Sequence, residues 1–233
     1  MPLDLTRPFS ALVLGASGGI GAAIADKLKS NPHCRALKTL SRSTDGFDLS
    51  KEQSVAAAAR NLQGEDSVYD LIFNATGILE VNGRPPEKSF RELDAATLTR
   101  AFAVNAAGAA MAIKYFSPLL RRNAPVVFAT LSARVGSIDD NRLGGWMSYR
   151  ASKAALNQIV RCAAVEEARR NKQSVFVALH PGTIQTPLTE KYARGQYTAT
   201  PEEAAKNLLD VCSRLTPEHS GGFFDYAGRE IEW

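Results

Sequence analysis

A tyrosine and a lysine stand four residues apart in the segment Tyr149-Arg150-Ala151-Ser152-Lys153. In a helix this spacing places both side chains on one face, next to each other. A tyrosine has an ordinary pKa of about 10, whereas a neighbouring ammonium favours the phenolate. For titration near neutral pH the tyrosine pKa must fall by about 2 to 3, which corresponds to roughly 3 to 4 kcal/mol. The pair therefore suits proton transfer, with Tyr149 as the exchanging group and Lys153 as its partner.

A glycine-rich turn follows the first apolar strand that we expect, at residues 10–14. The turn reads Gly15-Ala16-Ser17-Gly18-Gly19-Ile20-Gly21 and runs into residues with helical spacing. Glycines let the backbone turn sharply and approach a diphosphate, whose charge then meets the N-terminus of the helix. The turn therefore predicts a dinucleotide site, and a tight turn without a ligand is the alternative.

The same turn also matches G-x-S-x-G, the pattern of a hydrolase nucleophile elbow, with Ser17 as the nucleophile. Only 16 residues precede Ser17. That is too few for the strands and the oxyanion loop that this fold places before its nucleophile. No later pair of an acid and a histidine is convincing either, so the hydrolase interpretation is disfavoured.

Arg42 follows the second expected strand, at residues 36–40, about 20 residues beyond the glycines. An acidic residue here would bind the ribose 2′-hydroxyl of NAD, whereas an arginine can pair with the 2′-phosphate of NADP. The flanking serines can donate hydrogen bonds to the same phosphate. We therefore expect NADP(H) rather than NAD(H), and the alternative is that Arg42 is only a surface residue.

Over nearly its whole length the sequence resembles the short-chain dehydrogenase/reductase family, because seven motifs occur in that family's order. The glycine motif matches Gly15, Gly19 and Gly21, and the acidic element after the third strand matches Asp48-Leu49. The next elements match Asn74-Ala75-Thr76-Gly77 and Asn105. The active-site serine, tyrosine and lysine match Ser132, Tyr149 and Lys153, and the last element matches Pro181-Gly182 with Thr186 beyond.

The resemblance implies a role for each of these residues. Tyr149 would give a proton to a carbonyl oxygen or take one from an alcohol, and Ser132 would orient that oxygen. Lys153 would bind the nicotinamide ribose and lower the pKa of Tyr149, and Asn105 would help to hold a water. The expected cofactor-binding set is Gly15, Ser17, Gly18, Gly19, Ile20, Gly21, Arg42, Asp48, Leu49, Asn74, Ala75, Thr76, Gly77, Tyr149, Lys153, Pro181, Gly182, Ile184 and Thr186, with no metal.

The chain departs from the family pattern at Ala75, which replaces an asparagine, and in the interval of 17 residues from Ser132 to Tyr149, which is longer than usual. The extra residues, around 139–145, are expected to form a loop near the substrate. Ser137 is the alternative for the active-site serine, and Asn105 has an alternative role in pairing with neighbouring backbone. Within the family, segments 136–149 and 226–233 resemble the C-factor and sniffer-like carbonyl reductase group.

Composition supports one ordinary domain over residues 1–233. The chain is 45% hydrophobic and 22% charged, and its net charge of +4 comes from scattered lysines and arginines, so no nucleic-acid surface is expected. Three widely spaced cysteines without a CxxC pattern predict neither a disulfide framework nor a zinc site. We find no signal sequence and no apolar run that would span a bilayer, so we expect a cytoplasmic protein without a membrane span.

Apolar strands alternate with helical segments along the chain. This alternation favours an α/β domain of the Rossmann type, doubly wound, with about seven parallel strands and helices on both faces. Strands are expected at 10–14, 36–40, 69–73, 125–131, 175–180 and 222–226, and helices at 20–28, 51–62, 94–122, 149–170 and 201–214. Surface loops are expected at 82–89, 137–145 and 189–200.

The expected function is an NADP(H)-dependent oxidoreductase that transfers hydride between the nicotinamide and a small-molecule carbonyl or alcohol substrate. The alternative is an NADP(H)-binding signalling protein of the same fold with little turnover, against which the set Ser132, Tyr149, Lys153 and Asn105 argues. A sugar epimerase of the extended type also uses a Tyr-Lys pair, but the 80 residues after Lys153 leave no room for its second domain.

The pocket walls are expected in segments 78–81, 139–147 and 184–197. They include the apolar or aromatic residues Leu143, Trp146, Met147, Leu188 and Tyr192, which favour a partly apolar substrate. The family commonly pairs the helices that begin near Asp94 and Tyr149, so the resemblance implies a homodimer or homotetramer.

Overall fold

Six parallel strands form one sheet in the described residues, which are 1–65, 67–193 and 195–233 of the computed structural model. The second gap falls in the loop expected at 189–200. The strands are β1 (Phe9–Leu14), β2 (Cys34–Leu40), β3 (Leu71–Asn74), β4 (Val126–Leu131), β5 (Ser174–His180) and β6 (Phe223–Asp225). Their order across the sheet is β2-β1-β3-β4-β5-β6. The Rossmann-type fold class is therefore confirmed.

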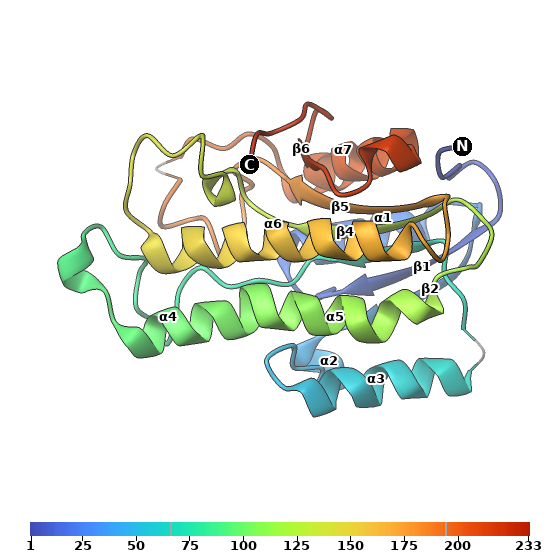
Figure 1. The fold of residues 1–233 in the computed structure, drawn as a ribbon, viewed down its shortest axis with the longest axis horizontal. Coiled ribbons are helices and arrows are strands. Elements are labelled where there is room, and N and C mark those ends of the chain that lie inside the picture. Colours follow the sequence, from blue (N-terminus) through green and yellow to red (C-terminus); the bar gives the residue numbers. More distant parts are fainter. Residues whose placement is uncertain (66, 194) are drawn as a thin grey trace.

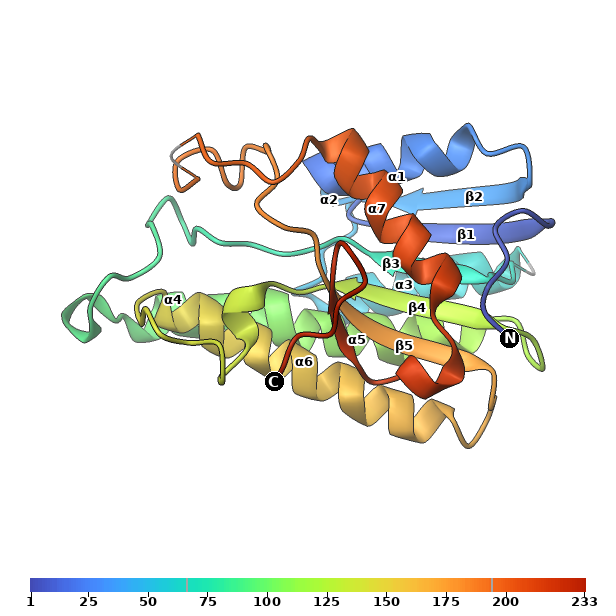
Figure 2. The ribbon, with the colours of Figure 1, turned by 90° about the horizontal axis from the view of Figure 1, so that it is seen from above.

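Helices cover both faces of the sheet (Figures 1 and 2). They are α1 (Gly19–Lys29), α2 (Arg42–Asp45), α3 (Glu52–Gly64), α4 (Ala95–Phe102), α5 (Gly108–Phe116), α6 (Met147–Glu167) and α7 (Pro201–Arg214). Short 3-10 turns lie at Phe90–Glu92, Ser117–Leu119, Arg134–Gly136 and Pro217–His219. Helices α1 and α7 lie on one face, and α3, α5 and α6 lie on the other.

The expected number of about seven strands is one too high for the described residues. The additional strand was expected between β2 and Asp48. That part of the chain forms the one-turn helix α2 instead. Ser41 caps this helix by accepting a hydrogen bond from the backbone of Thr44, and Gly46 ends it with a left-handed φ of 65°. The five residues that remain before α3, 47–51, form no strand.

The core is split by the sheet into two layers, because alternate side chains of each strand point to opposite faces. In β4, Val126 and Phe128 pack toward α5 and α6, whereas Val127, Ala129 and Leu131 pack toward α1 and α7. Phe128 stacks on Phe176 of β5 with ring centroids 5.3 Å apart. These buried strands hold the sheet rigid beneath the loops that follow it.

The long helix expected at 94–122 is interrupted near its middle. Asp94 caps α4 through its carboxylate, which accepts the N–H of Thr97 at 2.8 Å. A π-helical turn (Ala103–Ala107) then separates α4 from α5 and contains Asn105. By length and composition alone the stretch Ala95–Leu119 would suit a membrane crossing, and 44% of its apolar window is buried inside this fold.

The loops that follow β3, β4 and β5 all leave the same edge of the sheet, because parallel strands end together. Figure 2 shows all three loops leaving the sheet toward the left, the side on which α6 begins. The residues predicted for cofactor binding and catalysis come mainly from these loops and helix ends. Topology thus brings together motifs that lie more than a hundred residues apart.

The glycine turn allows a direct test of this architecture. A Cβ at Gly21 would overlap the carbonyl oxygen of Gly15, whereas a Cβ at Gly64, at the end of α3, meets nothing within 4 Å. Gly21→Ala should therefore lower the free energy of unfolding by about 1 to 3 kcal/mol through overpacking. Gly64→Ala should leave it unchanged or raise it by up to about 1 kcal/mol. Urea denaturation checks both, and equal stabilities of the two variants would contradict the tight turn.

Candidate active site

A cavity of about 790 Å³ opens where the three loops meet the starts of α1 and α6. Most of the predicted site residues line it: Ser17, Gly18, Gly19, Ile20, Gly21, Ala75, Thr76, Gly77, Ser132, Tyr149, Lys153, Pro181, Gly182, Ile184 and Thr186. The remaining predicted residues, Gly15, Arg42, Asp48, Leu49, Asn74 and Asn105, lie outside this lining. The fold therefore joins the glycine turn and the Tyr149–Lys153 pair in one cavity.

The glycine turn fits a diphosphate. Gly15 has a left-handed φ of 83°, and a Cβ at Gly19 would lie 2.7 Å from Cγ2 of Thr186. Gly18 caps α1 without a side-chain hydrogen bond, and the first turn carries no acidic residue. The first N–H groups of α1 thus need partners, and the positive end of the helix dipole favours an anion there. Cavity, backbone and charge together match a dinucleotide cofactor.

Arg42 begins α2 and is exposed, and it forms no ion pair with any described residue. The neighbouring Asp45 is engaged locally, because its carboxylate accepts hydrogen bonds from the backbone of Ser41 and the hydroxyl of Thr44. The Arg42 guanidinium is therefore exposed and not engaged by an acidic side chain of the described residues.

Asp48 and Leu49 behave differently from each other. The Asp48 carboxylate accepts the N–H and the hydroxyl of Ser50 at 3.0 and 2.7 Å, and the hydroxyl contact chiefly lowers its pKa. Leu49 is buried, and a Cβ at Gly108 would lie 2.8 Å from its Cγ. Leu49 thus packs the loop before α3 against the start of α5.

The segment after β3 runs close to Lys153. Asn74 is fully buried, and its Oδ1 accepts the N–H and hydroxyl of Thr76, so it shapes this turn. A Cβ at Gly77 would lie 3.3 Å from Lys153 Nζ and 3.4 Å from Asn105 Oδ1. Gly77 therefore lets the backbone pass close to both polar groups.

Lys153 and Tyr149 share one face of α6, as their spacing predicts. Lys153 is 2% exposed, and its Nζ donates to the carbonyl of Leu131 at 2.8 Å and lies 5.9 Å from the centre of the Tyr149 ring. Burial lowers the pKa of Lys153 to about 8. Burial also raises the pKa of Tyr149, the direction opposite to that expected from the lysine. The protein itself thus favours the protonated phenol, which is the proton-donating form.

Asn105 is 1% exposed within the π-helical turn. Its Oδ1 accepts the N–H of Ile78 and its Nδ2 donates to the carbonyl of Ile78, both at 2.9 Å. Its Nδ2 also donates to the hydroxyl of Ser152 at 3.0 Å. These contacts match the alternative role of pairing with neighbouring backbone, and they tie the segment after Gly77 to α6.

Ser132 has a partner other than the expected one. Its hydroxyl is buried and donates to Oδ1 of Asn157 at 2.6 Å, two helical turns beyond Tyr149. The alternative serine, Ser137, accepts the N–H of Asp140 at 3.1 Å and so begins the following loop. Within the described residues neither hydroxyl bonds to Tyr149. Ser132 lines the same cavity as Tyr149, and its hydroxyl proton is taken up by Asn157, so its predicted role toward the substrate oxygen stays a prediction.

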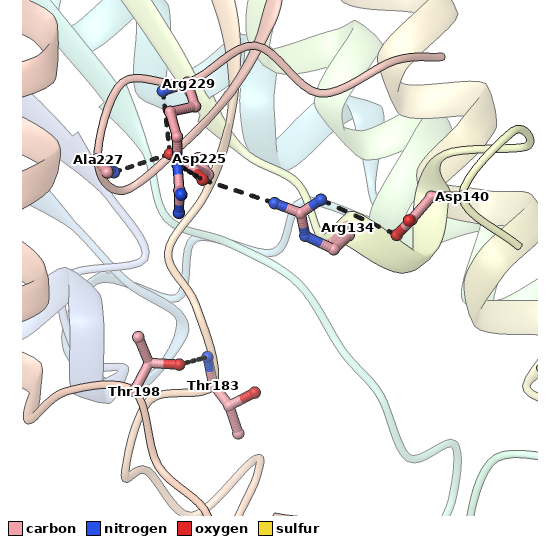
Figure 3. Close-up of polar contacts among 7 residues, drawn as sticks. All are labelled: Arg134, Asp140, Thr183, Thr198, Asp225, Ala227 and Arg229. Carbon is pink, nitrogen blue, oxygen red and sulfur yellow. Dashed lines mark hydrogen bonds and ion pairs between the residues drawn. The ribbon is translucent and has the colours of Figure 1, made fainter.

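Several cavity residues lie outside the motifs and were missed. Arg134 lines the cavity and pairs with Asp225 at 3.5 Å and Asp140 at 4.0 Å, while Arg229 binds the same Asp225 at 3.0 Å (Figure 3). His180 also lines the cavity, and its burial lowers its pKa to about 4, so it is neutral. No sequence motif marks these residues, because they meet only through the order of β4, β5 and β6.

The distal wall of the cavity is aromatic. Trp146 packs edge-to-face on Tyr149 and on Tyr192, with centroid distances of 6.3 and 5.5 Å. The Tyr192 hydroxyl donates to Glu80 at 2.7 Å, and the backbone of Thr183 donates to the Thr198 hydroxyl at 3.1 Å at the base of the same loop (Figure 3). Of the expected wall residues, Leu143, Trp146, Leu188 and Tyr192 line the cavity, and Met147 does not.

Comparison with known proteins gives similar sequences over most of the chain. The family model described as enoyl-(acyl carrier protein) reductase matches residues 15–211. The 1-hydroxy-2-glutathionyl-2-methyl-3-butene dehydrogenase of Rhodococcus sp. (strain AD45) is 31% identical over 234 residues, covering 96% of this chain and 99% of that protein. The C-signal of Myxococcus xanthus is 38% identical over 142 residues, covering 61% of this chain and 82% of that protein.

Solved structures show the same fold. The carbonyl reductase Sniffer of D. melanogaster superposes with a TM-score of 0.83 at 20% identity, and the NADPH-bound carbonyl reductase from chicken fatty liver with 0.81 at 24% identity. Each comparison covers 97% of this chain and 100% of the other. Because the family match runs from the glycine turn into the last helix, and the Rhodococcus relative aligns over nearly all of both chains, this protein belongs to the short-chain dehydrogenase/reductase family of oxidoreductases.

Proposed function

We propose that the protein is an NADP(H)-dependent oxidoreductase that transfers hydride between the nicotinamide and a carbonyl or alcohol substrate, with Tyr149 as the acid/base. One observation carries the proposal: the glycine turn and the Tyr149–Lys153 pair open into the same cavity. The Rhodococcus dehydrogenase, which is 31% identical, and the NADPH-bound carbonyl reductase from chicken support the same chemistry.

When bound, the cofactor supplies the hydride. The N-terminus of α1 would hold its diphosphate, and Arg42 would pair with its 2′-phosphate. Lys153 would turn from the Leu131 carbonyl to the ribose hydroxyls beside Tyr149. On reduction the protonated phenol of Tyr149 donates to the carbonyl oxygen, and on oxidation the phenolate accepts the proton.

The substrate that we propose is a partly apolar carbonyl or alcohol compound, since Leu143, Trp146, Leu188 and Tyr192 form much of the wall. We propose a homodimer or homotetramer and a cytoplasmic location as well. The oligomer is supported by the family likeness, and the location by the sequence patterns alone.

A second candidate is an NADP(H)-binding signalling protein with little turnover. It is favoured by Ser132, whose hydroxyl proton is engaged by Asn157. The 38% identity to the Myxococcus C-signal over 142 residues also fits this candidate. Turnover distinguishes the two functions, because both need the cofactor site and only the enzyme needs the proton donor.

Removal of the Tyr149 hydroxyl tests the proposed function. Tyr149→Phe should lower turnover by about 100-fold or more, because general acid catalysis contributes on that scale. Binding of NADPH should stay close to wild type, since the glycine turn is untouched. The measurement is NADPH oxidation across aldehydes, ketones, quinones and acyl-thioester ketones, with NADPH binding followed by fluorescence.

Ser132→Ala is the contrasting variant. It removes a buried hydrogen bond and should cost about 1 kcal/mol of stability, and it should lower turnover less than Tyr149→Phe, because Ser132 would orient the substrate oxygen but transfer no proton. Near-normal turnover in Tyr149→Phe would refute the proton-transfer role. A loss in Ser132→Ala as large as that in Tyr149→Phe would instead show that Ser132 leaves Asn157 to meet the substrate.

Cofactor preference should depend on Arg42. Arg42→Asp replaces a positively charged hydrogen-bond donor with a carboxylate, which would repel the negatively charged 2′-phosphate. The affinity for NADPH should therefore fall by about tenfold or more, and the affinity for NADH should change little. Arg35→Asp is the control. It makes the same charge change at an exposed residue near the start of β2, whereas Arg42 follows the end of that strand. Titration of both cofactors checks the prediction, which an unchanged NADPH preference in Arg42→Asp would contradict.

The burial of Lys153 should make the free energy of unfolding depend on pH. The pKa of Lys153 is about 8 in the folded protein and about 10.5 when the chain unfolds. Below pH 8 both states bind the proton, and the folded state carries the full cost of a buried ammonium. Between about pH 8 and 10 the unfolded state binds more protons, so this cost decreases as pH rises.

Lys153→Met removes the titrating group. The stability of the wild-type protein relative to this variant should therefore increase from about pH 8 to 10. Exposed Lys29 supplies the control, because Lys29→Met should show no such trend. Urea denaturation of the cofactor-free proteins at several pH values gives the result, and a flat difference for Lys153→Met would rule out the lowered pKa.

A further inference from the structure

Glu87 is a buried acid in a segment that the sequence analysis assigns to a surface loop. Its residue is 3% exposed, and the preceding Pro86 is buried too. It forms no ion pair with a lysine or arginine of the described residues. A buried carboxylate is costly unless hydrogen bonds or dipoles compensate it. The compensation here comes from the first turn of α6.

Glu87 makes three contacts with the start of α6. Its Oε2 accepts the N–H of Ser148 at 3.2 Å, and its Oε1 accepts the Ser148 hydroxyl. Its backbone carbonyl accepts the N–H of Trp146 at 2.5 Å. Figures 1 and 2 both show the segment between β3 and α4 reaching the end of the molecule where α6 begins.

These contacts replace a cap that α6 lacks. Trp146 occupies the capping position, and its side chain makes no capping hydrogen bond. The first N–H groups of a helix have no partner within the helix, and a carboxylate near them interacts favourably with the helix dipole. Glu87 therefore caps the helix from another segment of the chain.

The backbone before α6 needs such support. Gly144, Gly145 and Trp146 have φ values of 64°, 65° and 54°, all in the left-handed region. For a tryptophan this conformation costs on the order of 1 to 3 kcal/mol and persists only where the surroundings impose it. A Cβ at Gly145 would lie 3.4 Å from the Glu87 carbonyl oxygen, so the turn packs directly on Glu87.

Tyr149 depends on the same turn. It follows Ser148 directly, and its ring packs on Trp146, which the Glu87 carbonyl holds. Lys153 lies one turn further along and is fixed separately, through its burial and its bond to the Leu131 carbonyl. Loss of the Glu87 carboxylate would therefore disturb Tyr149 while Lys153 and the glycine turn stay in place.

We propose that Glu87 is a positioning residue that caps the Tyr149 helix from the β3–α4 segment and so fixes Tyr149 and Trp146 relative to Lys153. Its kinetic consequence rests on the proposed role of Tyr149 as the acid/base. Its structural consequence, the placement of Trp146, does not rest on that role.

Three variants separate positioning from general damage. Glu87→Ala removes both side-chain contacts with Ser148. Glu87→Gln keeps one carbonyl oxygen that can still accept the Ser148 N–H. Glu92→Ala is the matched control, because exposed Glu92 accepts a hydrogen bond from the backbone of Lys88 within the same segment and does not reach α6.

The kinetic measurement is kcat and KM for NADPH-dependent reduction by the full-length protein. Glu87→Ala should lower kcat by about 10- to 100-fold, as expected for a misplaced reacting group. The KM for NADPH should change little, Glu87→Gln should recover most of kcat, and Glu92→Ala should match wild type. A Glu87→Ala protein with wild-type kcat, or one whose NADPH KM rises as much as kcat falls, would overturn the proposal.

The second measurement does not need turnover. In a Trp233→Phe background the remaining tryptophan is Trp146, so its emission reports the turn before α6. Glu87→Ala should shift this emission to longer wavelength, while Glu87→Gln and Glu92→Ala should not. An unchanged emission in Glu87→Ala would refute the cap, whatever the turnover of Tyr149→Phe. A shifted emission in a protein without turnover would support the cap and refute only the enzymatic function.

Discussion

Lys153 is held among backbone atoms of three separate segments, two of them at its ammonium and one at its Cβ, and the rest of the site is arranged around it. A Cβ at Gly77 would lie 3.3 Å from its Nζ, and a Cβ at Gly136 would lie 2.8 Å from its own Cβ, while Leu131 supplies the accepting carbonyl. Two glycines far apart in the sequence thus make room for one lysine. Because close packing leaves no space for larger residues, this position fixes how α6 sits on the sheet.

Burial acts in opposite directions on the pKa values of Lys153 and Tyr149. It lowers the pKa of Lys153 and raises that of Tyr149, because both charged forms lose hydration. The protein alone therefore keeps the proton on the phenol, which is the form that the proposed carbonyl reduction requires. Oxidation of an alcohol needs the phenolate, which the lysine ammonium stabilises when the two groups meet. In the proposed mechanism, the pH dependence of the rate in each direction would thus depend on how closely Lys153 approaches Tyr149.

Much of this site can be predicted from local sequence patterns. The parts that cannot be predicted depend on tertiary contacts. The spacing of Tyr149 and Lys153, the glycine turn and the alternation of strands each reflect one element, so sequence alone is enough to predict them. Ser132 was placed by its order in the chain, but the direction of its hydroxyl depends on a tertiary contact with Asn157 of α6. Glu87 lies among prolines and polar residues typical of a surface loop, and only the packing of that loop on α6 buries it.

The long interval before Tyr149 has a structural explanation in the same contacts. Its extra residues form a loop that is tied down at several points: Ser137 accepts the N–H of Asp140, the N–H of Asp139 donates to the carbonyl of Trp233, and Arg134 pairs with Asp140. The loop then ends in the left-handed run from Gly144 to Trp146, which rests on Glu87. A shorter connection could enter α6 directly, but it would not place Trp146 against Tyr149. The added length therefore builds the aromatic wall of the cavity, and a buried acid on the facing segment is what allows the helix to begin there.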